Sequence, residues 1–425
     1  MWRAFNRLGD DAGTFDSARL WVEGLFNNRI FDLFINQTYT VMSNEVLTAV
    51  PLFLFMGYVV ERANIVSRLF TTLNIASRNI PGSMGVAALI TCALFATATG
   101  IVGAVVTLMG LLALPAMMKA RYDPSFATGI ICAGGTLGIL IPPSIMLVVM
   151  GPVLEVPVTT LFAAAIVPGI LLATMFTGYA MIRCYLNPSL GPPLALEEHP
   201  ENMRAIWREF FLGLVPPAGL VLAALGSILF GLATPTEGAG CGAAGALLLS
   251  AAYGKLTWPN LRDAAIKTLE ISVLILFLVA ASNFFGAVFA RLGTPTMLTE
   301  LLLGLDLNRY VLLLMIMALI FLLGWPLEWV PIVLIVVPFM IPLVTKLGFD
   351  LTWFGILVAV NLQTAWLSPP VALSAYFLKG VVPEWQLSDI YKGMLQFMVL
   401  QMIALILIIA FPQIALWLPG LLYPD

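Results

Sequence analysis

The sequence predicts an all-α polytopic membrane protein of two inverted repeats, each with a re-entrant helical hairpin and a broken helix. Three observations support this prediction. Of the 425 residues, 60% are hydrophobic and 10% are charged, against about 25% charged in soluble domains, and the mean hydropathy is +0.99. Several apolar stretches have the wrong length for a simple span. The second half of the chain also repeats features of the first half, 227 residues later.

The same composition excludes several classes of protein. The net charge is −3 and there is no basic face, so a nucleic-acid partner is excluded. The single histidine, His199, lies in a polar loop, which excludes histidine metal sites and triads. None of the four cysteines pairs at metal-binding spacing, and three lie inside apolar runs; they are Cys92, Cys132, Cys184 and Cys241. No HExxH, GxSxG or paired-Asp motif indicates an enzyme, and no cofactor is expected.

Residues 1–44 are expected to form a polar, amphipathic segment at the membrane interface. Aromatic residues there alternate with charged ones such as Glu23, Arg29 and Asp32, a pattern typical of interfacial helices rather than spans. We see no apolar core of a signal peptide in residues 1–18.

Two apolar stretches are too short to cross a bilayer. Residues 84–98 and 309–323 have 15 residues each, which reach about 22 Å at roughly 1.5 Å per residue, short of a hydrocarbon core of roughly 30 Å. Each is followed at once by a tight break and a second apolar stretch. The sequence therefore predicts re-entrant hairpins over 84–118 and 309–344, with tips at Thr97–Gly100 and Gly324–Glu328.

Two other stretches, 125–150 and 350–378, are interrupted by double prolines. Pro142-Pro143 and Pro369-Pro370 each remove two backbone donors and disfavour helix just before them. Each stretch is expected to unwind near the middle of the membrane. Non-helical backbone survives there only when it is buried in protein or lines a wet cavity.

A shift of 227 residues superposes these features. Pro115, Lys119, Asp123, Leu140 and the first double proline fall on identical residues, which makes six identities in 29 positions. We expect repeat 1 over 45–182, a cytoplasmic connecting loop over 183–209, and repeat 2 over 210–425. Five or seven crossings separate Asp123 from Asp350. An odd number makes the repeats inverted.

The distribution of basic residues predicts the orientation. Thirteen Lys and Arg residues fall on one side of the predicted spans, and three fall on the other, or seven with the N-terminal arginines. The richer side is therefore expected in the cytoplasm, which places the C-terminus on the outside.

Inverted repeats with broken helices at the midplane are the plan of a secondary transporter. Unwound backbone offers carbonyls to a cation, and half-helix N-termini offer positive dipole ends to an anion. Neither break carries Lys or Arg, so an anionic substrate would meet dipoles and co-bound cations. There is also no His at the breaks and almost no buried acid, so sodium coupling is favoured over a proton relay. The predicted sodium-binding residues lie at the tips and breaks: Thr97, Thr99, Gly100, Thr136, Gly138, Gly324, Thr364 and Ser368.

The predicted substrate-binding residues lie beside them. They are Ser144, Pro142, Pro143, Glu328, Gln363, Pro369 and Pro370. Glu328 is the one acid that the predicted spans place at depth, where a charge costs roughly 2.5–3.5 kcal/mol; a partly solvated hairpin tip is its alternative interpretation. A channel and a carrier that works alone remain alternative functions.

Several motifs resemble the large permease subunit of the TRAP transporters, the tripartite ATP-independent periplasmic carriers. They are residues 135–144, Tyr122-Asp123-Pro124, Pro51–Gly57, Thr234–Glu237, and Asn361–Thr364 with Pro369-Pro370. Residues 43–47 and 99–104 resemble the branch labelled mannitol/chloroaromatic. One departure precedes Pro51, where the family has one or two apolar spans and residues 1–44 are more polar.

The resemblance implies a multi-pass protein of the bacterial inner membrane, embedded in the lipid bilayer. Its expected partners are a small four-helix membrane subunit and a periplasmic substrate-binding protein. It implies sodium-driven import of a small organic acid by an elevator-type movement, with sodium ions as coupling ions. In the family an acid commonly follows the tip of the second hairpin, and Glu328 fills that place.

Overall fold

The computed structural model describes residues 28–63, 65–76, 82–192 and 203–424, and within them every regular element is helical. In chain order the elements are α3 (Asn28–Met42), η1 (Glu45–Thr48), α4 (Ala49–Arg62), α5 (Ile65–Ala76), α6 (Ser83–Thr99), α7 (Val102–Lys119), α8 (Pro124–Leu140), α9 (Ile145–Leu154), α10 (Val158–Leu186), α11 (Met203–Leu229), α12 (Pro235–Ala252), α13 (Trp258–Arg291), α14 (Thr294–Leu303), α15 (Arg309–Leu323), α16 (Trp329–Pro331), η3 (Ile332–Val336), α17 (Val337–Lys346), α18 (Leu351–Leu367), α19 (Leu373–Val381), α20 (Leu387–Ala410) and α21 (Gln413–Leu422).

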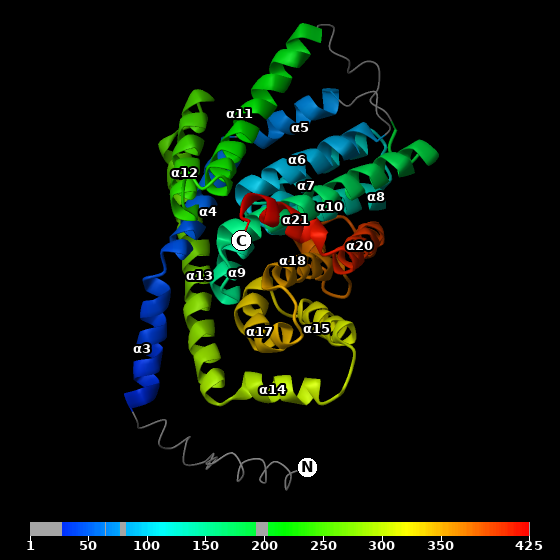
Figure 1. Ribbon diagram of the computed structural model, residues 1–425. Coiled ribbons are helices and arrows are strands. Elements are labelled where there is room, and N and C mark those ends of the chain that lie inside the picture. Colours follow the sequence, from blue (N-terminus) through cyan, green and yellow to red (C-terminus); the bar gives the residue numbers. More distant parts are fainter. Residues whose placement is uncertain (1–27, 64, 77–81, 193–202, 425) are drawn as a thin grey trace.

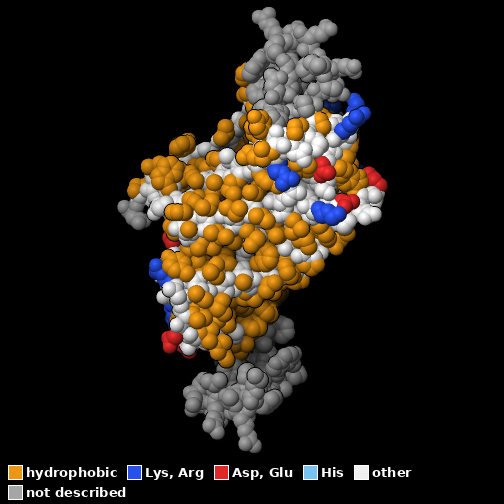
Figure 2. Space-filling view, turned by 90° about the vertical axis from the view of Figure 1, so that its right-hand side faces the viewer, with side chains coloured by type: hydrophobic (Ala, Val, Ile, Leu, Met, Phe, Trp, Pro, Cys, Tyr) orange, Lys and Arg blue, Asp and Glu red, His pale blue; other side chains and the backbone are white. Residues whose placement is uncertain are grey.

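The described helices have the dimensions of a polytopic membrane protein. Six are long and apolar enough to cross a membrane, and two bent pairs raise the number to as many as eight. Large apolar side chains face outward on them, with Leu248, Phe277 and Ile406 at least 60% exposed. Figure 2 shows one face as a broad hydrophobic surface with most of its charged side chains toward the upper and lower parts. Contact with lipid explains this surface, because soluble proteins rarely expose an apolar patch of this extent to water.

The 227-residue shift reproduces the element bounds. Adding 227 to the bounds of α8 gives 351–367, the range of α18. The same shift carries α7 onto 329–346, the range that α16, η3 and α17 span together. It also carries α5 onto α14 and α10 onto α20 to within three residues. The chain therefore contains two copies of one helical plan.

The two copies enclose one body that lies beside a separate layer. In Figure 1, α3, α4, α12 and α13 form an upright layer, and α11 lies against it. The hairpins and broken helices form the body with α10, α20 and α21. The helices α5 and α14 connect the layer to the body at opposite ends (Figure 1). We call the upright layer with α11 the scaffold. The opposite placement of α5 and α14 is what an inverted repeat requires.

The segment before α4 is more integrated than an interfacial helix. Residues 1–27 lie outside the described residues. The helix α3 packs along α13, where Phe34 meets Phe284 with ring centroids 5.5 Å apart and Leu33 and Val41 are buried. With η1 and α4 it forms one apolar pair bent by 56°. Part of the apolar face that the sequence analysis assigned to the interface packs on α13, while Ile35, Tyr39 and Met42 remain more than 60% exposed.

The helices flanking the connecting loop are longer than expected. The helix α10 continues to Leu186, and α11 begins at Met203, so both enter the range 183–209 predicted for the loop. Residues 193–202 lie outside the described residues. The extra turn of α10 is stabilised by Arg183, whose guanidinium lies 5.7 Å from the ring centroid of Tyr179.

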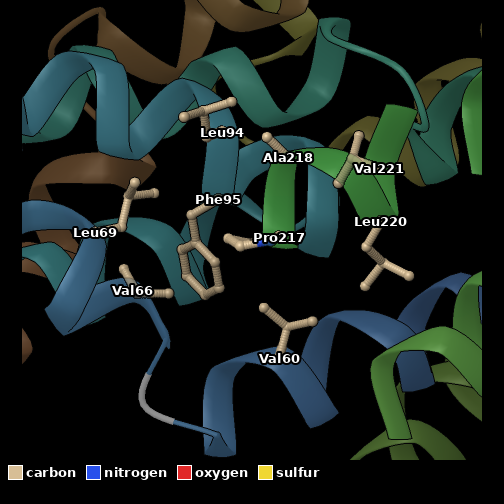
Figure 3. Close-up of a pocket in the computed structure, with 9 residues that line it drawn as sticks. All are labelled: Val60, Val66, Leu69, Leu94, Phe95, Pro217, Ala218, Leu220 and Val221. Atoms are coloured by element: carbon tan, nitrogen blue, oxygen red, sulfur yellow. The ribbon is translucent and has the colours of Figure 1, made fainter. Parts of the chain in front are cut away.

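Scaffold and body meet along an apolar seam. A small cavity of about 20 Å³ lies there between α4, α5, α6 and α11. Figure 3 shows the nine side chains around it, which are Val60, Val66, Leu69, Leu94, Phe95, Pro217, Ala218, Leu220 and Val221. All nine are apolar, so this part of the seam carries no side-chain hydrogen bonds that a movement would have to break.

Candidate functional site

Both broken helices unwind where the double prolines predict. The helix α8 ends at Leu140 and α9 begins at Ile145, with a bend of 40° between them. The helix α18 ends at Leu367 and α19 begins at Leu373. Proline has no N–H to continue a helix, so the chain is extended at Ile141 and at Ser368. Each break therefore leaves one helix C-terminus and one helix N-terminus inside the body.

The tip of the first hairpin rests on the first break. A Cβ on Gly138 would lie 3.2 Å from the Cβ of Ala96, and a Cβ on Gly100 would lie 3.2 Å from Cγ1 of Ile145. Gly100 has φ +62°, the left-handed conformation that glycine adopts without strain, and it ends α6 by donating its N–H to the carbonyl of Ala96 at 2.8 Å. The C-terminal ends of α6 and α8 are therefore in contact.

The second hairpin makes the equivalent contact. A Cβ on Gly324 would lie 2.6 Å from the Cβ of Ala365, so the end of α15 touches the last turn of α18. Ala365 and Gly138 are equivalent under the 227-residue shift. In both repeats, two helix C-termini converge, and the last carbonyls of each helix lack intrahelical donors. Such carbonyls carry partial negative charge and favour a cation.

The predicted sodium-binding hydroxyls lie at these converging ends. Thr97 donates to the carbonyl of Leu94 at 2.7 Å, Thr136 to that of Ala133 at 2.8 Å, and Thr364 to that of Val360 at 3.0 Å. Each hydroxyl oxygen keeps lone pairs that can accept a hydrogen bond or coordinate a cation, and the oxygen of Thr136 also accepts a hydrogen bond from Gln401. Ser368 donates to the carbonyl of Pro369 at 3.1 Å. The side chain of Thr99 lies outside the described residues.

Two buried glutamines hold Thr136 from the second repeat. Gln363 donates to the Thr136 carbonyl at 2.9 Å, and Gln401 on α20 donates to the Thr136 hydroxyl at 3.0 Å. Both glutamines are fully buried. Gln363 and Thr136 are 227 residues apart, so equivalent positions of the two repeats touch, as they do where a pseudo-twofold axis passes. The broken helices α8 and α18 are joined at that axis.

A cavity of about 100 Å³ opens between the two hairpin tips, both broken helices and α13. Its lining contains one charged side chain, Glu328, and neither Lys nor Arg. The lining residues are Gly100, Ile101, Val102, Gly103, Ile139, Ile145, Ile271, Leu274, Ile275, Leu278, Glu328, Trp329, Val330, Trp366 and Phe377.

Three helix N-termini border this cavity. Ile101 precedes α7, Ile145 begins α9, and Glu328 precedes the helix Trp329–Lys346. All three residues line the cavity. None of the three helices has a side-chain cap on its first N–H groups. Uncapped N–H groups and the positive ends of three helix dipoles make this cavity favourable for an anion.

Thr99 aside, whose side chain lies outside the described residues, only two of the predicted site residues line the cavity. They are Gly100 and Glu328. Ser144 is buried and donates to the carbonyl of Ile139, and Gln363 faces Thr136. The prolines 142, 143, 369 and 370 shape the breaks without lining the cavity.

The sequence analysis missed the aromatic and α13 residues. Trp366 and Phe377 pack against each other with ring centroids 6.5 Å apart, and both line the cavity. Trp366 is 3% exposed, and its Nε1–H has no hydrogen-bond acceptor. A tryptophan two residues before Ser368, the one aromatic residue within residues 355–368, was the available signal. Among the described residues no His, Cys, Asp or Glu cluster could hold a metal ion.

Comparison with known proteins identifies a family of membrane transporters. The family described as "Tripartite ATP-independent periplasmic transporter, DctM component" matches residues 15–414. The chain is 30% identical over 378 residues to the C4-dicarboxylate TRAP transporter large permease protein of Pseudomonas aeruginosa, covering 88% of this chain and 86% of that protein. It is also 30% identical over 383 residues to the sialic acid TRAP transporter large permease protein of Vibrio cholerae, covering 89% and 87%.

A solved structure supports the fold. The crystal structure of the Alcanivorax borkumensis YdaH transporter, described as revealing an unusual topology, matches with a TM-score of 0.61. The match covers 94% of this chain and 90% of that one at 19% sequence identity. At that identity the likeness establishes the arrangement of helices alone.

Proposed function

Because this chain belongs to the family of TRAP transporter large permeases, we propose that it is the permease subunit of a sodium-coupled transporter that imports a small organic acid. Members of this family are transporters and not enzymes, and they reside in the inner membrane as multi-pass proteins. One observation carries the proposal. Helix C-termini meet at the hairpin tips, whereas helix N-termini border the cavity.

This arrangement of helix ends offers positive dipole ends to an anion and negative dipole ends to a cation. An organic anion in the cavity meets the N-termini of α7, α9 and Trp329–Lys346. A sodium ion beside Gly138 or Ala365 meets carbonyls from two helix C-termini, with Thr97 or Thr364 nearby on the same helix ends. A bound cation lowers the electrostatic cost of the anion, and the reverse holds equally, since coupling between two sites is reciprocal. Sodium binding and substrate binding would reinforce each other.

An elevator movement would carry both ligands together. The tips, breaks and cavity belong to the body, except for the α13 side chains that close the cavity from the scaffold. The apolar seam of Figure 3 supports sliding, since dispersion contacts re-form in a new register. The arms α5 and α14 would then act as the connections that change angle.

The partners follow from the family and from the shape of the loops. A TRAP permease works with a small membrane subunit and a periplasmic substrate-binding protein. We propose that the small subunit has four helices and that the C-terminus of this chain faces the periplasm. The loops 155–157 and 230–234 are short, and Glu155 is their only charge. They offer little to capture a dilute anion, which supports delivery by a binding protein.

Reconstitution tests this function directly. Proteoliposomes holding the chain and the small subunit are supplied with the binding protein, its substrate and an inward sodium gradient. Uptake is expected only when all three proteins and the gradient are present. High-affinity uptake by the chain alone would favour a stand-alone anion carrier instead. Uptake driven equally well by a proton gradient without sodium would refute sodium coupling, and non-saturable flux would indicate a channel.

A further inference from the structure

Building on the proposed function, which treats the cavity as the substrate site, we propose that residues 324–336 of the second hairpin are the gate of that cavity. The gate moves away from α18 and α13 to admit or release the substrate, while the first hairpin stays packed in the body. The two hairpins are equivalent under the 227-residue shift, and the contacts in which they differ assign the gate to one of them.

Both hairpins form walls of the cavity. Residues Gly100–Gly103 line it from the first hairpin, and Glu328–Val330 line it from the second. Each of these wall segments lies at the connection between two helices, so it can move without breaking a continuous helix. Which of the two moves depends on how tightly each hairpin is packed.

The first hairpin is fixed by close contacts at glycines. A Cβ on Gly103 of α7 would lie 2.9 Å from the ring of Phe377 on α19, and a Cβ on Gly135 of α8 would lie 2.3 Å from Cγ2 of Val106 on α7. Contacts this short leave no free space between α7 and its neighbours, so the hairpin cannot move without losing them. In the second repeat both glycine positions carry bulkier residues, Val330 and Leu362. These glycine contacts therefore have no counterpart there.

The second hairpin has an uncovered face and an irregular return helix. On α15, Leu314, Leu319 and Leu322 are 43–53% exposed, and among the described helices its main neighbour is α18. A π-helical turn, Ile332–Val336, follows the tip, whereas the equivalent residues 105–109 are regular α-helix. Such turns are rare and interrupt regular helical hydrogen bonding. A segment with few packed neighbours opens at a lower free energy than one that is packed on all sides.

Polar groups of the second tip also favour opening. In the position seen here the tip packs on α18 through Gly324 and Ala365, and its return helix packs on α13. The Nε1–H of Trp325 is then buried without an acceptor, which costs free energy. Movement of the gate away from α18 would bring water to this donor, so part of the cost of opening is offset.

Hydrogen exchange of the full-length wild-type chain in lipid nanodiscs, read by mass spectrometry, compares the two return helices without any substitution. The N–H groups of residues 332–336 are expected to exchange at least about tenfold faster than those of the equivalent residues 105–109, because only the gate opens locally. Equal exchange rates in the two segments would overturn the proposal.

Disulfides test whether the gate controls access to the cavity. Ile275→Cys places a thiol on the α13 wall of the cavity, at a position that is 5% exposed, and its reaction with N-ethylmaleimide is followed by mass spectrometry of that peptide. Gly324→Cys with Ala365→Cys joins the second tip to α18; their Cβ atoms would lie 2.6 Å apart and need a shift of about 1 Å for a disulfide. Val106→Cys with Gly135→Cys, whose Cβ atoms would lie 3.5 Å apart, joins the first hairpin to α8 and is the matched control.

Oxidation of the second-tip pair is expected to slow the labelling of Ile275→Cys by at least about tenfold, and reduction should restore the rate. Oxidation of the control pair should leave the rate unchanged. Equal slowing by both disulfides, or an unchanged rate with the second-tip disulfide, would overturn the proposal. Hydrogen exchange in the unmodified chain decides the question if a cysteine pair prevents folding. Neither measurement needs sodium, substrate or a binding protein, so a failure here is distinct from a failure of the proposed function.

Discussion

The two hairpin tips occupy equivalent places in the two repeats and differ in closure. Two residues, Gly100 and Ile101, connect the helices at the first tip. Thr97, just before this tip, is 7% exposed. The second tip needs five residues, Gly324–Glu328, and ends in the exposed residue Glu328. A π-helical turn, Ile332–Val336, follows it. Both tips line the cavity, but the first is a short, packed turn and the second is a longer segment that brings a carboxylate to it.

Their neighbours explain the difference. The helix α6 is covered by α4, α5, α8 and α10, whereas α15 packs mainly on α18. Two apolar helices at equivalent positions thus acquire different burial from the elements around them. The asymmetry places a carboxylate beside the cavity at only one of the two tips. Both repeats bring helix C-termini together, and the divergence of their tips shapes the cavity between them.

The largest expected effect concerns a close helix crossing between the two repeats. A Cβ on Gly393 of α20 would lie 1.8 Å from the carbonyl oxygen of Ser125 on α8. The equivalent of Gly393 is Ile166 on α10, which is only partly buried. We expect Gly393→Ala to destabilise the fold by about 3 kcal/mol or more, and Ile166→Ala to cost far less. Thermal unfolding in detergent measures the stability of both variants. Equal losses of stability would contradict the expected difference between the α20 and α10 positions.

The next effect compares the tips themselves. Gly324→Ala would place Cβ atoms 2.6 Å apart, whereas Gly138→Ala would place them 3.2 Å apart. The Gly138 contact can relax by a few tenths of an ångström, whereas the Gly324 contact cannot. Gly324→Ala is therefore expected to raise the sodium concentration for half-maximal uptake by about tenfold or more, and Gly138→Ala by less. Unchanged sodium dependence in Gly324→Ala would argue against a cation at the second tip.

A smaller effect distinguishes the two glutamine contacts with Thr136, one from the equivalent position of the second repeat and one from α20. Gln363 binds the backbone carbonyl of Thr136, which survives Thr136→Val, whereas Gln401 binds the hydroxyl, which does not. Each Gln→Leu change is expected to cost about 1–2 kcal/mol. A double-mutant cycle with Thr136→Val should show coupling to Gln401→Leu and additivity with Gln363→Leu. Coupling of equal size to both glutamines would contradict these contacts.

The smallest expected effect is a loss of stability in the scaffold, at the start of α12. Thr234 and Glu237 form a capping box at the start of α12, with Thr234 N–H donating to Glu237 at 2.8 Å. These hydrogen bonds lower the pKa of Glu237. Thr234→Ala should cost about 1 kcal/mol of stability and leave the sodium dependence of uptake unchanged. A shifted sodium dependence would mean that scaffold and tips are coupled.

The sequence predicted the features that depend on local chemistry. Pro142-Pro143 and Pro369-Pro370 determine where the helices break, and the 227-residue shift predicted the equivalence of α8 and α18. The cavity could not be predicted in the same way. Ile271 and Trp366 are 95 residues apart, and they share a cavity only because α13 lies beside the tips. The role of Gln401 likewise depends on α20 crossing α8, which no local pattern in α20 reveals.

The central claim is that the hairpins and broken helices of both repeats form one body that moves against the scaffold. Spin labels at Leu111 on α7 and Leu248 on α12 probe this movement across the seam, and labels at Leu111 and Ile406 on α20 probe the body alone. All three positions are exposed, and the exposed Cys241 is first replaced by serine. Pulsed electron resonance in lipid nanodiscs compares sodium-free with sodium-saturated protein. We predict that the Leu111–Leu248 distances change while the Leu111–Ile406 distances stay constant. A fixed Leu111–Leu248 distance, or equal changes in both pairs, would contradict the account.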